Sequence, residues 1–271
     1  MPGEAALADH VGMLPLAWKA HNPVASPPQL VPGTIHLWSV DLAQSDAALT
    51  RYLTPSDRDR GARIVDAGKR RLYLGGRAGM RLLLSAYTGI DYDAIRFGYG
   101  SRGKPVLAND EGTVMPEFNY TLSRDKVLYA LSLDQALGVD MEALPRTASA
   151  GQLAARMLTA SERAAWERIP LHLRNDAMLC CWTRKEAYGK AIGVGIRYNL
   201  GQVALFQEPG NSGFRTPVQG LFRNTETDGM PRHLEGVQLE LPFPAVAALM
   251  YPADASDRVK PAISAHRLIV E

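Results

Sequence analysis

Two clusters of charged residues, about forty positions apart, carry the side chains best suited to chemistry. The first is GVDME, Gly138 to Glu142, and the second is WTRKEAYGKAIGVG, Trp182 to Gly195. If the first cluster is a strand, Asp140 and Glu142 project from one face with about 6.6 Å between their Cα atoms, so both carboxylates can reach one hard cation. Two neighbouring carboxylates repel each other unless a cation or a base neutralises them. The pattern predicts such a partner, although a strand end that emerges into water before Pro145 is the alternative.

The second cluster predicts a helix with both signs of charge on one face. An apolar segment, Ala177 to Trp182, leads into it, and a glycine pair that begins at Gly193 is typical of a helix C-terminus. At 3.6 residues per turn, Trp182, Glu186 and Lys190 lie along one face. An ordinary solvated pair of glutamate and lysine, worth roughly 0.2–0.5 kcal/mol, is the alternative. The acidic cluster upstream favours a functional role, and for Trp182 we predict a packing role.

Strands on both sides of the first cluster are expected to position it. Thr34 to Val40 has strand composition and opens the globular part. Val127 to Leu133 is predicted to be a buried strand, with Ala136 to Met141 as its return partner. Val237 to Tyr251 predicts a final strand pair, and residues 207–236, rich in glycine, proline and polar residues, predict a long loop.

A helix-start pattern occurs twice along the chain. LTPSDR begins at Leu53 and LTASER begins at Leu158, 105 residues later. Each has a threonine suited to cap a helix, at Thr54 and at Thr159, with an acidic residue three positions later. The recurrence predicts two similar halves, although two matching caps can also arise by coincidence.

Basic residues are dense in the first predicted helical region. Eight of them lie between the first cap and Leu84: Arg58, Arg60, Arg63, Lys69, Arg70, Arg71, Arg77 and Arg81. Such residues need anions or water, so a phosphate site and a solvated helix face are both open. The loop FGYGSRGKP, Phe97 to Pro105, could bring backbone N–H groups and Lys104 to a phosphate, or be a simple turn.

Composition excludes several classes of protein. The chain has 271 residues, 46% of them hydrophobic, and a net charge of +2, which is too mild to argue for nucleic acid binding. Cys180 and Cys181 are adjacent, which excludes a disulfide framework and favours the cytoplasm. We expect no membrane span and no signal peptide, because long apolar runs are lacking. The sequence also lacks HExxH, CxxC, GxSxG and Walker motifs.

Taken together, these motifs resemble the 4′-phosphopantetheinyl transferases, specifically the longer surfactin-synthetase-activating (Sfp-type) class. The resemblance rests on GVDME and WTRKEAYGKA, supported by LTPSDRDRGAR, KRRLYLGGRAGMRLLL, GKP and FNYTLS, and it spans about residues 31 to 205. It implies an α+β fold of two similar halves, related by pseudo-two-fold symmetry, with the active site between them. We expect an N-terminal extension at residues 1–33, a coenzyme A-binding half at 34–136, and a half with the metal site at 137–271.

The resemblance also implies a reaction. The family transfers 4′-phosphopantetheine from coenzyme A to a serine of an apo-acyl or peptidyl carrier protein, and releases adenosine 3′,5′-bisphosphate. Asp140, Glu142 and Glu186 are then expected to hold Mg²⁺, while Lys190 neutralises charge on the pyrophosphate. Glu186 is our candidate for the base that takes the serine proton, and Glu142 is the other candidate.

Further coenzyme A contacts are expected from the matched motifs. The residues concerned are Arg60, Arg71, Lys104, Pro105, Thr121, Lys185 and Lys190. The sequence departs from the family at Leu122, where a histidine that helps to hold the 3′-phosphate is usual. We therefore predict either weaker discrimination between coenzyme A and its dephospho form, or compensation by Arg71 and Thr121.

We expect a monomeric cytoplasmic protein whose partners are coenzyme A and a carrier protein, with neither nucleic acid nor a membrane involved. The carrier could serve fatty acid, polyketide or nonribosomal peptide synthesis. Two other functions stay open: a different Mg²⁺-dependent phosphoryl-transfer enzyme that uses the same carboxylates, and a non-catalytic homologue that binds coenzyme A or a carrier protein.

Overall fold

The chain folds into two compact units. The computed structural model describes residues 13–26, 29–100, 104–108, 115–145, 149–193, 200–206, 213–217, 233–253 and 260–270. One unit, here called the N-unit, is built around Ala17–Ser101, Pro105–Asp134 and Pro261–Glu271. The other, the C-unit, is built around Gln135–Lys260 and also takes in Lys104. Each unit has its own sheet and is described by itself.

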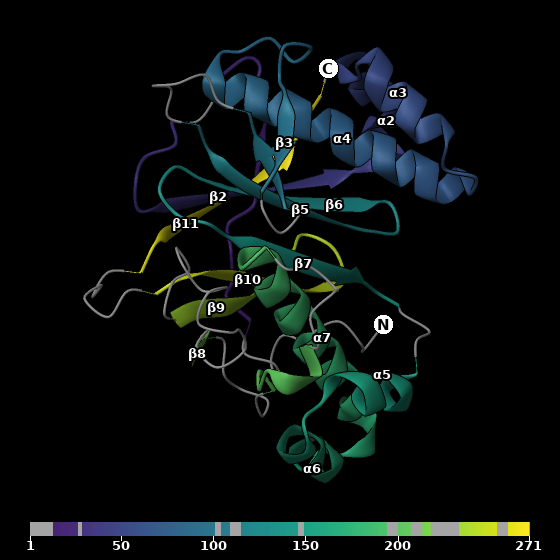
Figure 1. The fold of residues 1–271 in the computed structure, drawn as a ribbon, viewed down its shortest axis with the longest axis vertical. Helices are drawn as coiled ribbons and strands as arrows, with labels where there is room; N and C mark the ends of the chain where they lie inside the picture. Colours follow the sequence, from purple (N-terminus) through teal and green to yellow (C-terminus); the bar gives the residue numbers. More distant parts are fainter. Residues whose placement is uncertain are drawn as a thin grey trace. The chain divides into compact units, whose positions relative to one another are not determined.

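The N-unit contains a five-stranded sheet in the order β1-β11-β2-β6-β5. Its strands are β1 (Lys19–His21), β2 (Thr34–Asp41), β5 (Glu117–Ser123), β6 (Lys126–Ser132) and β11 (Ala262–Leu268), and a separate hairpin pairs β3 (Phe97–Tyr99) with β4 (Pro105–Leu107). Its helices are α2 (Leu42–Leu49), η1 (Thr50–Tyr52), α3 (Pro55–Ala62) and α4 (Ala67–Thr88). Figure 1 shows α4 running across this sheet. The apolar residues of α4, which include Met80, Leu83 and Leu84, are buried because they form the stripe that faces the core.

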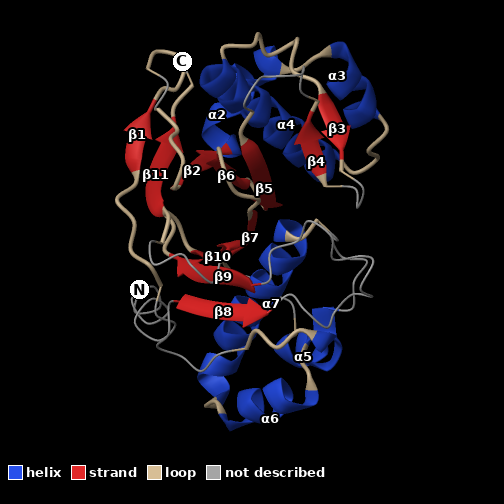
Figure 2. Ribbon diagram, turned by 60° about the vertical axis from the view of Figure 1, so that its left-hand side comes forward, coloured by secondary structure: helices blue, strands red, loops and turns tan. Residues whose placement is uncertain are grey.

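The C-unit contains a four-stranded antiparallel sheet in the order β7-β10-β9-β8, visible in Figure 2. Its strands are β7 (Gly138–Ala143), β8 (Gly213–Pro217), β9 (His233–Leu239) and β10 (Ala245–Pro252). Its helices are α5 (Ala150–Met157), α6 (Ala160–Arg168), η2 (Leu171–Leu173), α7 (Arg174–Ala191) and η4 (Leu200–Gln202). Helix α7 packs against β7 and β10, so it is buried along most of its length.

The two units follow the same path. In each, a strand, β2 or β7, is followed by helices and then by an antiparallel pair whose last strand, β6 or β10, returns beside the first. The N-unit also has β1 before this path and β11 after it. Both predicted caps are present: Thr54 and Asp57 form a capping box at α3, and Thr159 and Glu162 form one at α6. The α+β fold and its two similar halves are therefore confirmed, while the symmetry operation that relates the halves stays a prediction.

The two ends of the chain do not follow the domain boundaries expected from the sequence. Strand β1 falls inside the proposed extension, residues 1–33, and β11 falls inside the proposed C-terminal half, yet β11 lies between β1 and β2 in the N-unit sheet. Parallel pairing across the whole chain length brings it there, and local sequence patterns carry no signal for such pairing. Leu14 belongs to the C-unit and makes a bridge with Leu239 of the same unit.

One expected strand pairing and one expected loop are wrong. β6 pairs with β2 and β5, and β7 pairs with β10, whereas the expected return partner of Val127 to Leu133 was Ala136 to Met141, which overlaps β7. The expected strand pair at Val237 to Tyr251 is confirmed as β9 and β10, although β11 follows it in the chain. The predicted loop at 207–236 contains β8 and the start of β9, and its other residues lie outside the described part of the chain. Among the described helices, none combines the length and the apolar content that a membrane span needs.

Candidate active site

Close packing of β7 on α7 begins at Gly138. A Cβ atom at this position would lie 2.1 Å from the carbonyl oxygen of Ala187 and 2.3 Å from the amide nitrogen of Ala191. Any side chain would therefore push the strand away from the helix. At the helix end, Gly193 has a φ of 78°, the left-handed conformation typical of a helix C-terminus. The two glycines fix where the helix lies and where it stops.

The two carboxylates of β7 share the face that α7 covers, as the alternation of the strand predicted. The ammonium group of Lys190 donates to Asp140 Oδ1 at 2.7 Å and to the carbonyl oxygen of Val139 at 3.0 Å. The indole Nε1 of Trp182 donates to Glu142 Oε1 at 3.0 Å. The helix and the strand thus bring both sequence clusters together.

Glu186 lies on α7 between these two contacts. Its side chain is buried, with 8% of the residue exposed. Burial, followed by the negative charge of Asp140, raises the pKa of Glu186 to about 7, with a smaller contribution from Glu142, while Lys190 acts in the opposite direction. Among the described residues, Glu186 thus shares its surroundings with two other carboxylates and one ammonium group.

Lys185 does not join this cluster. It is 0% exposed, and its ammonium donates to Glu162 Oε2 at 2.7 Å and to the carbonyl oxygen of Met157. Burial alone would raise the pKa of Glu162, but hydrogen bonds from Lys185 and the Thr159 amide hold it below its usual value. In this structure Lys185 is therefore an interior residue that joins α7 to α6, and its expected contact with coenzyme A stays a prediction.

Glu162 also holds the chain beyond α7. Its Oε1 accepts hydrogen bonds from the amides of Leu205 at 2.6 Å and Phe206 at 2.7 Å. One buried carboxylate therefore fastens the start of α6, the middle of α7 and the segment 205–206. Lys185 and Glu162 thus hold α7 in a fixed position. A site that includes Glu186, the residue after Lys185, requires such a rigid helix.

The fit of a divalent cation can be judged from this donor set. Within the described residues, no three histidine, cysteine or acidic side chains already converge as a metal-binding group. Asp140 and Glu142 are each hydrogen-bonded by a side chain of α7. The donor set nevertheless suits a hard cation, because it consists of carboxylates, and burial together with the charges of Asp140 and Glu142 raises the pKa of Glu186.

The other residues expected to bind coenzyme A lie apart from this cluster in the chain. Arg71, on α4, donates to Asp46 Oδ2 and to the carbonyl oxygen of Leu42, both at 2.8 Å. Lys104 donates to the carbonyl oxygen of Leu137 at 2.9 Å in the C-unit. These two cations are engaged by the protein itself in this structure.

Two more of the expected coenzyme A residues lie in strands of the N-unit. Pro105 opens β4, and Thr121 is buried in β5. Leu122, the residue at the family's histidine position, is half-buried and packs on the N-unit core, close to Gly76. The leucine is thus used for packing.

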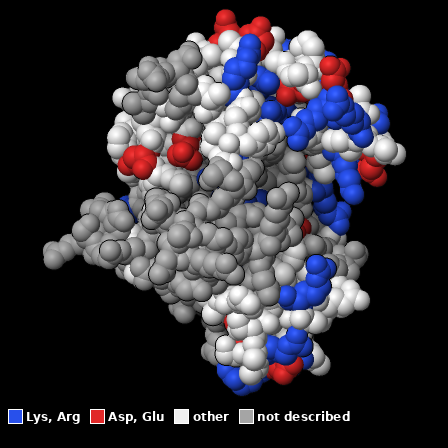
Figure 3. All heavy atoms as spheres, viewed as in Figure 1, with Lys and Arg blue, Asp and Glu red and all other residues white. Residues whose placement is uncertain are grey.

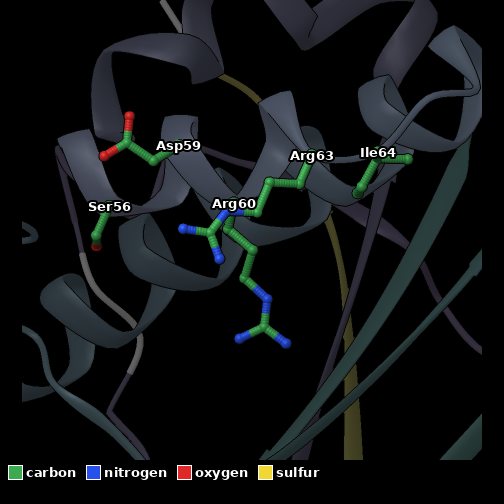
Figure 4. Close-up of a pocket in the computed structure, with 5 residues that line it drawn as sticks. All are labelled: Ser56, Asp59, Arg60, Arg63 and Ile64. Carbon is green, nitrogen blue, oxygen red and sulfur yellow. The ribbon is translucent and has the colours of Figure 1, made fainter.

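Arg60 lines a pocket beside α3. The pocket has a volume of about 570 Å³. Figure 4 shows the residues that line it, Ser56, Asp59, Arg60, Arg63 and Ile64. Arg60 also donates to the hydroxyl of Tyr99 at 2.9 Å. In Figure 3, lysine and arginine side chains gather over the region of α3 and α4. The pocket is suited to an anionic ligand.

Two of the basic residues that the sequence left open as phosphate ligands have a structural role. Arg77 and Arg81 both donate to the buried carboxylate of Asp57, and Arg81 also reaches the carbonyl oxygens of Tyr92 and Ile95. Burial would raise the pKa of Asp57, but hydrogen bonds from Arg81, Thr54 and Arg77 lower it to about 2. Sequence spacing could not separate these arginines from the exposed ones.

Comparison with known proteins gives the family. The model of the 4′-phosphopantetheinyl transferase superfamily matches residues 136–230, and the model of the N-terminal part of 4′-phosphopantetheinyl transferases matches residues 37–133. The 4′-phosphopantetheinyl transferase HetI of a Nostoc species is 30% identical over 181 residues, which cover 65% of this chain and 76% of HetI. The chain therefore belongs to the 4′-phosphopantetheinyl transferase family and is a transferase.

More distant relatives match shorter shares of their own length. The mouse L-aminoadipate-semialdehyde dehydrogenase-phosphopantetheinyl transferase is 28% identical over 169 residues, which cover 59% of this chain and 55% of the mouse protein. A phosphopantetheinyl transferase of a Thraustochytrium species is 28% identical over 187 residues, which cover 62% of this chain and 64% of that protein.

Proposed function

We propose that this protein transfers the 4′-phosphopantetheine group of coenzyme A to a serine of an apo-acyl or peptidyl carrier protein. The observation that carries the proposal is the meeting of the two sequence clusters in the C-unit. Asp140 and Glu142 of β7 lie against Glu186 and Lys190 of α7. Family membership supplies the class of reaction, and this charged cluster supplies groups able to perform it.

In the proposed reaction, the serine hydroxyl oxygen attacks the β-phosphate of coenzyme A. A bond forms between that oxygen and phosphorus, and the bond from the same phosphorus to the oxygen bridging the two phosphates breaks. Adenosine 3′,5′-bisphosphate leaves, and the serine proton passes to a carboxylate. Glu186 is our candidate for this base, because it lies on α7 between the contacts that Lys190 and Trp182 make with the other two carboxylates, and Glu142 is the other candidate.

Lys190 is proposed to neutralise charge on the phosphates. Its side chain is 24% exposed, although the ammonium group pairs with Asp140. The charge of a fixed ammonium stabilises the extra negative charge that develops as the phosphate bond breaks. Asp140 holds the ammonium group where this charge is needed.

Asp140, Glu142 and Glu186 are proposed to hold Mg²⁺, which prefers carboxylate oxygens together with water and phosphate. When bound, the ion would neutralise pyrophosphate charge. We also propose that Arg60 at its pocket binds a phosphate of coenzyme A, with Lys104, Pro105, Thr121 and Arg71 as further contacts. Arg71 and Lys104 would first have to leave the partners they have in this structure.

The setting of the protein is part of the same proposal. We propose the Sfp-type class, a monomer, and a cytoplasmic location without nucleic acid or membrane partners. The two adjacent buried thiols of Cys180 and Cys181 support a role in packing, since burial raises the pKa of both to about 12.

Intact-mass spectrometry of an apo-carrier protein tests this function. The carrier is incubated with the protein, coenzyme A and Mg²⁺, with and without EDTA. A mass gain of one phosphopantetheine that EDTA prevents is the expected result. Coenzyme A binding without any gain across several carriers would favour a non-catalytic homologue, and release of phosphopantetheine without a carrier would indicate a hydrolase.

A further inference from the structure

Trp182 has a polar contact that its sequence position did not reveal. The side chain is half-buried and packs against the C-unit core, which agrees with the expected packing role. Its indole N–H also donates to the carboxylate of Glu142 at 3.0 Å. The tryptophan therefore contacts one of the three carboxylates of the candidate site.

The spacing of residues along α7 matches the spacing along β7, which explains why this contact forms. Trp182, Glu186 and Lys190 follow one another at intervals of four residues, or about 6 Å along a helix. Asp140 and Glu142 are two residues apart on β7, or about 6.6 Å. Lys190 holds Asp140 at one end and Trp182 holds Glu142 at the other, so the two donors flank Glu186.

The two donors differ in charge. Lys190 cancels one negative charge of the cluster, whereas the indole of Trp182 orients a carboxylate without adding positive charge. A hydrogen bond to a carboxylate favours its ionised form and restricts its rotation. A neutral donor therefore orients Glu142 without cancelling its charge.

We propose that Trp182 is a positioning residue that orients Glu142 through its indole N–H and thereby sets the affinity of the carboxylate cluster for a divalent cation. The inference rests on the proposed function, because the cation belongs to that function. Groups that orient metal-binding carboxylates typically change metal affinity by about 10- to 100-fold when they are removed.

The test compares Trp182→Phe with Trp166→Phe. Phenylalanine keeps an aromatic ring but removes the N–H group. Trp166 is a matched control, because its Nε1 donates to the carbonyl oxygen of Arg174 at 2.9 Å in the same unit, away from the acidic cluster. Both variants lose one indole hydrogen bond, and Trp182→Phe alone loses the one to Glu142.

Two readouts are taken for each variant. The first is the Mg²⁺ concentration at half-maximal transfer, separated from kcat at saturating Mg²⁺. The second is the shift in melting temperature that Mg²⁺ produces without coenzyme A or carrier protein. For Trp182→Phe we expect a half-saturating Mg²⁺ concentration about tenfold higher, a smaller melting shift, and a retained kcat. Trp166→Phe should respond to Mg²⁺ like the wild-type protein.

A third variant, Trp182→His, restores a neutral N–H donor at about pH 8, where imidazole is uncharged. It should need less Mg²⁺ than Trp182→Phe, and it replaces that variant if Trp182→Phe does not fold. The inference is overturned if Trp182→Phe and Trp166→Phe have the same Mg²⁺ dependence, or if Trp182→His needs as much Mg²⁺ as Trp182→Phe. Wild-type protein that transfers nothing but melts at a higher temperature with Mg²⁺ would instead contradict the proposed function alone.

Discussion

Helices α3 and α4 of the N-unit can be compared with helices α6 and α7 of the C-unit. α3 begins with Thr54 and Asp57, and α6 begins with Thr159 and Glu162, each pair forming a capping box. In both units the acidic residue of the box is buried. The same local device therefore starts both helical layers.

A cation from the long following helix meets each of these acids. Arg81 of α4 pairs with Asp57, and Lys185 of α7 pairs with Glu162 at 2.7 Å. In both cases the hydrogen bonds lower the pKa of the acid despite its burial. Because both units contain this pair, we interpret it as part of the scaffold.

The units differ at the residue that follows the cation. In α4 this residue is Leu82, which is buried in the N-unit core. In α7 it is Glu186, whose pKa is raised to about 7 by burial and by the neighbouring Asp140. The scaffold carboxylates thus have lowered pKa values, and the carboxylate that we assign to chemistry has a raised one.

Strands β2 and β7 differ in the same way. On β2, His36 Nδ1 lies 2.7 Å from the hydroxyl of Tyr87 of α4, and the Trp38 indole donates to the same hydroxyl at 2.9 Å. On β7, the corresponding contacts of Asp140 and Glu142 are with a lysine and a tryptophan of α7. A shared helix and strand packing therefore carries aromatic groups in one unit and a charged cluster in the other, so the chemistry depends on a few substitutions in a common frame.

Lys190→Ala is expected to have the largest effect among the variants that test this comparison. Loss of the ammonium group removes charge stabilisation of the phosphates and should lower kcat by about 10²-fold or more. Lys126→Ala is the control, because Lys126 pairs with Asp41 at 2.8 Å in the N-unit. Equal transfer rates for the two variants would mean that Lys190 forms only an ordinary ion pair on the helix and does not act in the reaction.

Lys185→Met tests whether the buried pair belongs to the scaffold. It should lower the free energy of unfolding by about 3 kcal/mol, the lower end for breaking a buried pair, because Glu162 keeps its backbone N–H donors. Arg71→Ala, which breaks a pair whose arginine side chain is 44% exposed, should cost less than about 1 kcal/mol. Urea unfolding measures both, and similar losses in the two variants would contradict the scaffold assignment.

The acid dependence of stability should show a smaller effect. The folded pKa of Asp57 is about 2, below its ordinary value of 3.8, so the stabilisation it gives is present above about pH 4 and is lost as the pH falls towards 2. The lowered pKa of Glu162 has the same sign below its ordinary value of 4.5. Asp57→Asn and Glu162→Gln should each flatten the loss of unfolding free energy in acid. Unchanged slopes would mean that these carboxylates are not held by their cations.

The parts of the fold that the sequence predicted are those set by local pattern. The two capping boxes, the extent of α7 to its glycine end at Gly193, and the shared face of Asp140 and Glu142 all follow from spacing within a few residues. That β7 and α7 come together was inferred from charge and from family resemblance. In the structure, Lys190 of α7 donates a hydrogen bond to Asp140 of β7.

The parts that the sequence did not predict depend on contacts between distant residues. β7 pairs with β10, more than a hundred residues later, and β11 crosses to the N-unit sheet. By its sequence position, Lys185 was expected to join the candidate site. Instead it lies in the interior, where it pairs with Glu162 of another helix. The donor role of Trp182 was missed for the same reason, since no spacing rule marks an indole that faces a carboxylate 40 residues away.

The most direct test of the account is the transfer activity of Glu186→Gln. This substitution removes a charge and a proton acceptor while keeping the side-chain volume, and Glu167→Gln changes an exposed glutamate of α6 in the same way. Intact-mass spectrometry of an apo-carrier protein should show a phosphopantetheine on the carrier with wild-type protein and with Glu167→Gln. With folded Glu186→Gln the rate should fall by at least about 10²-fold. Transfer by Glu186→Gln at the wild-type rate would contradict the assignment of this helix and strand as the active site.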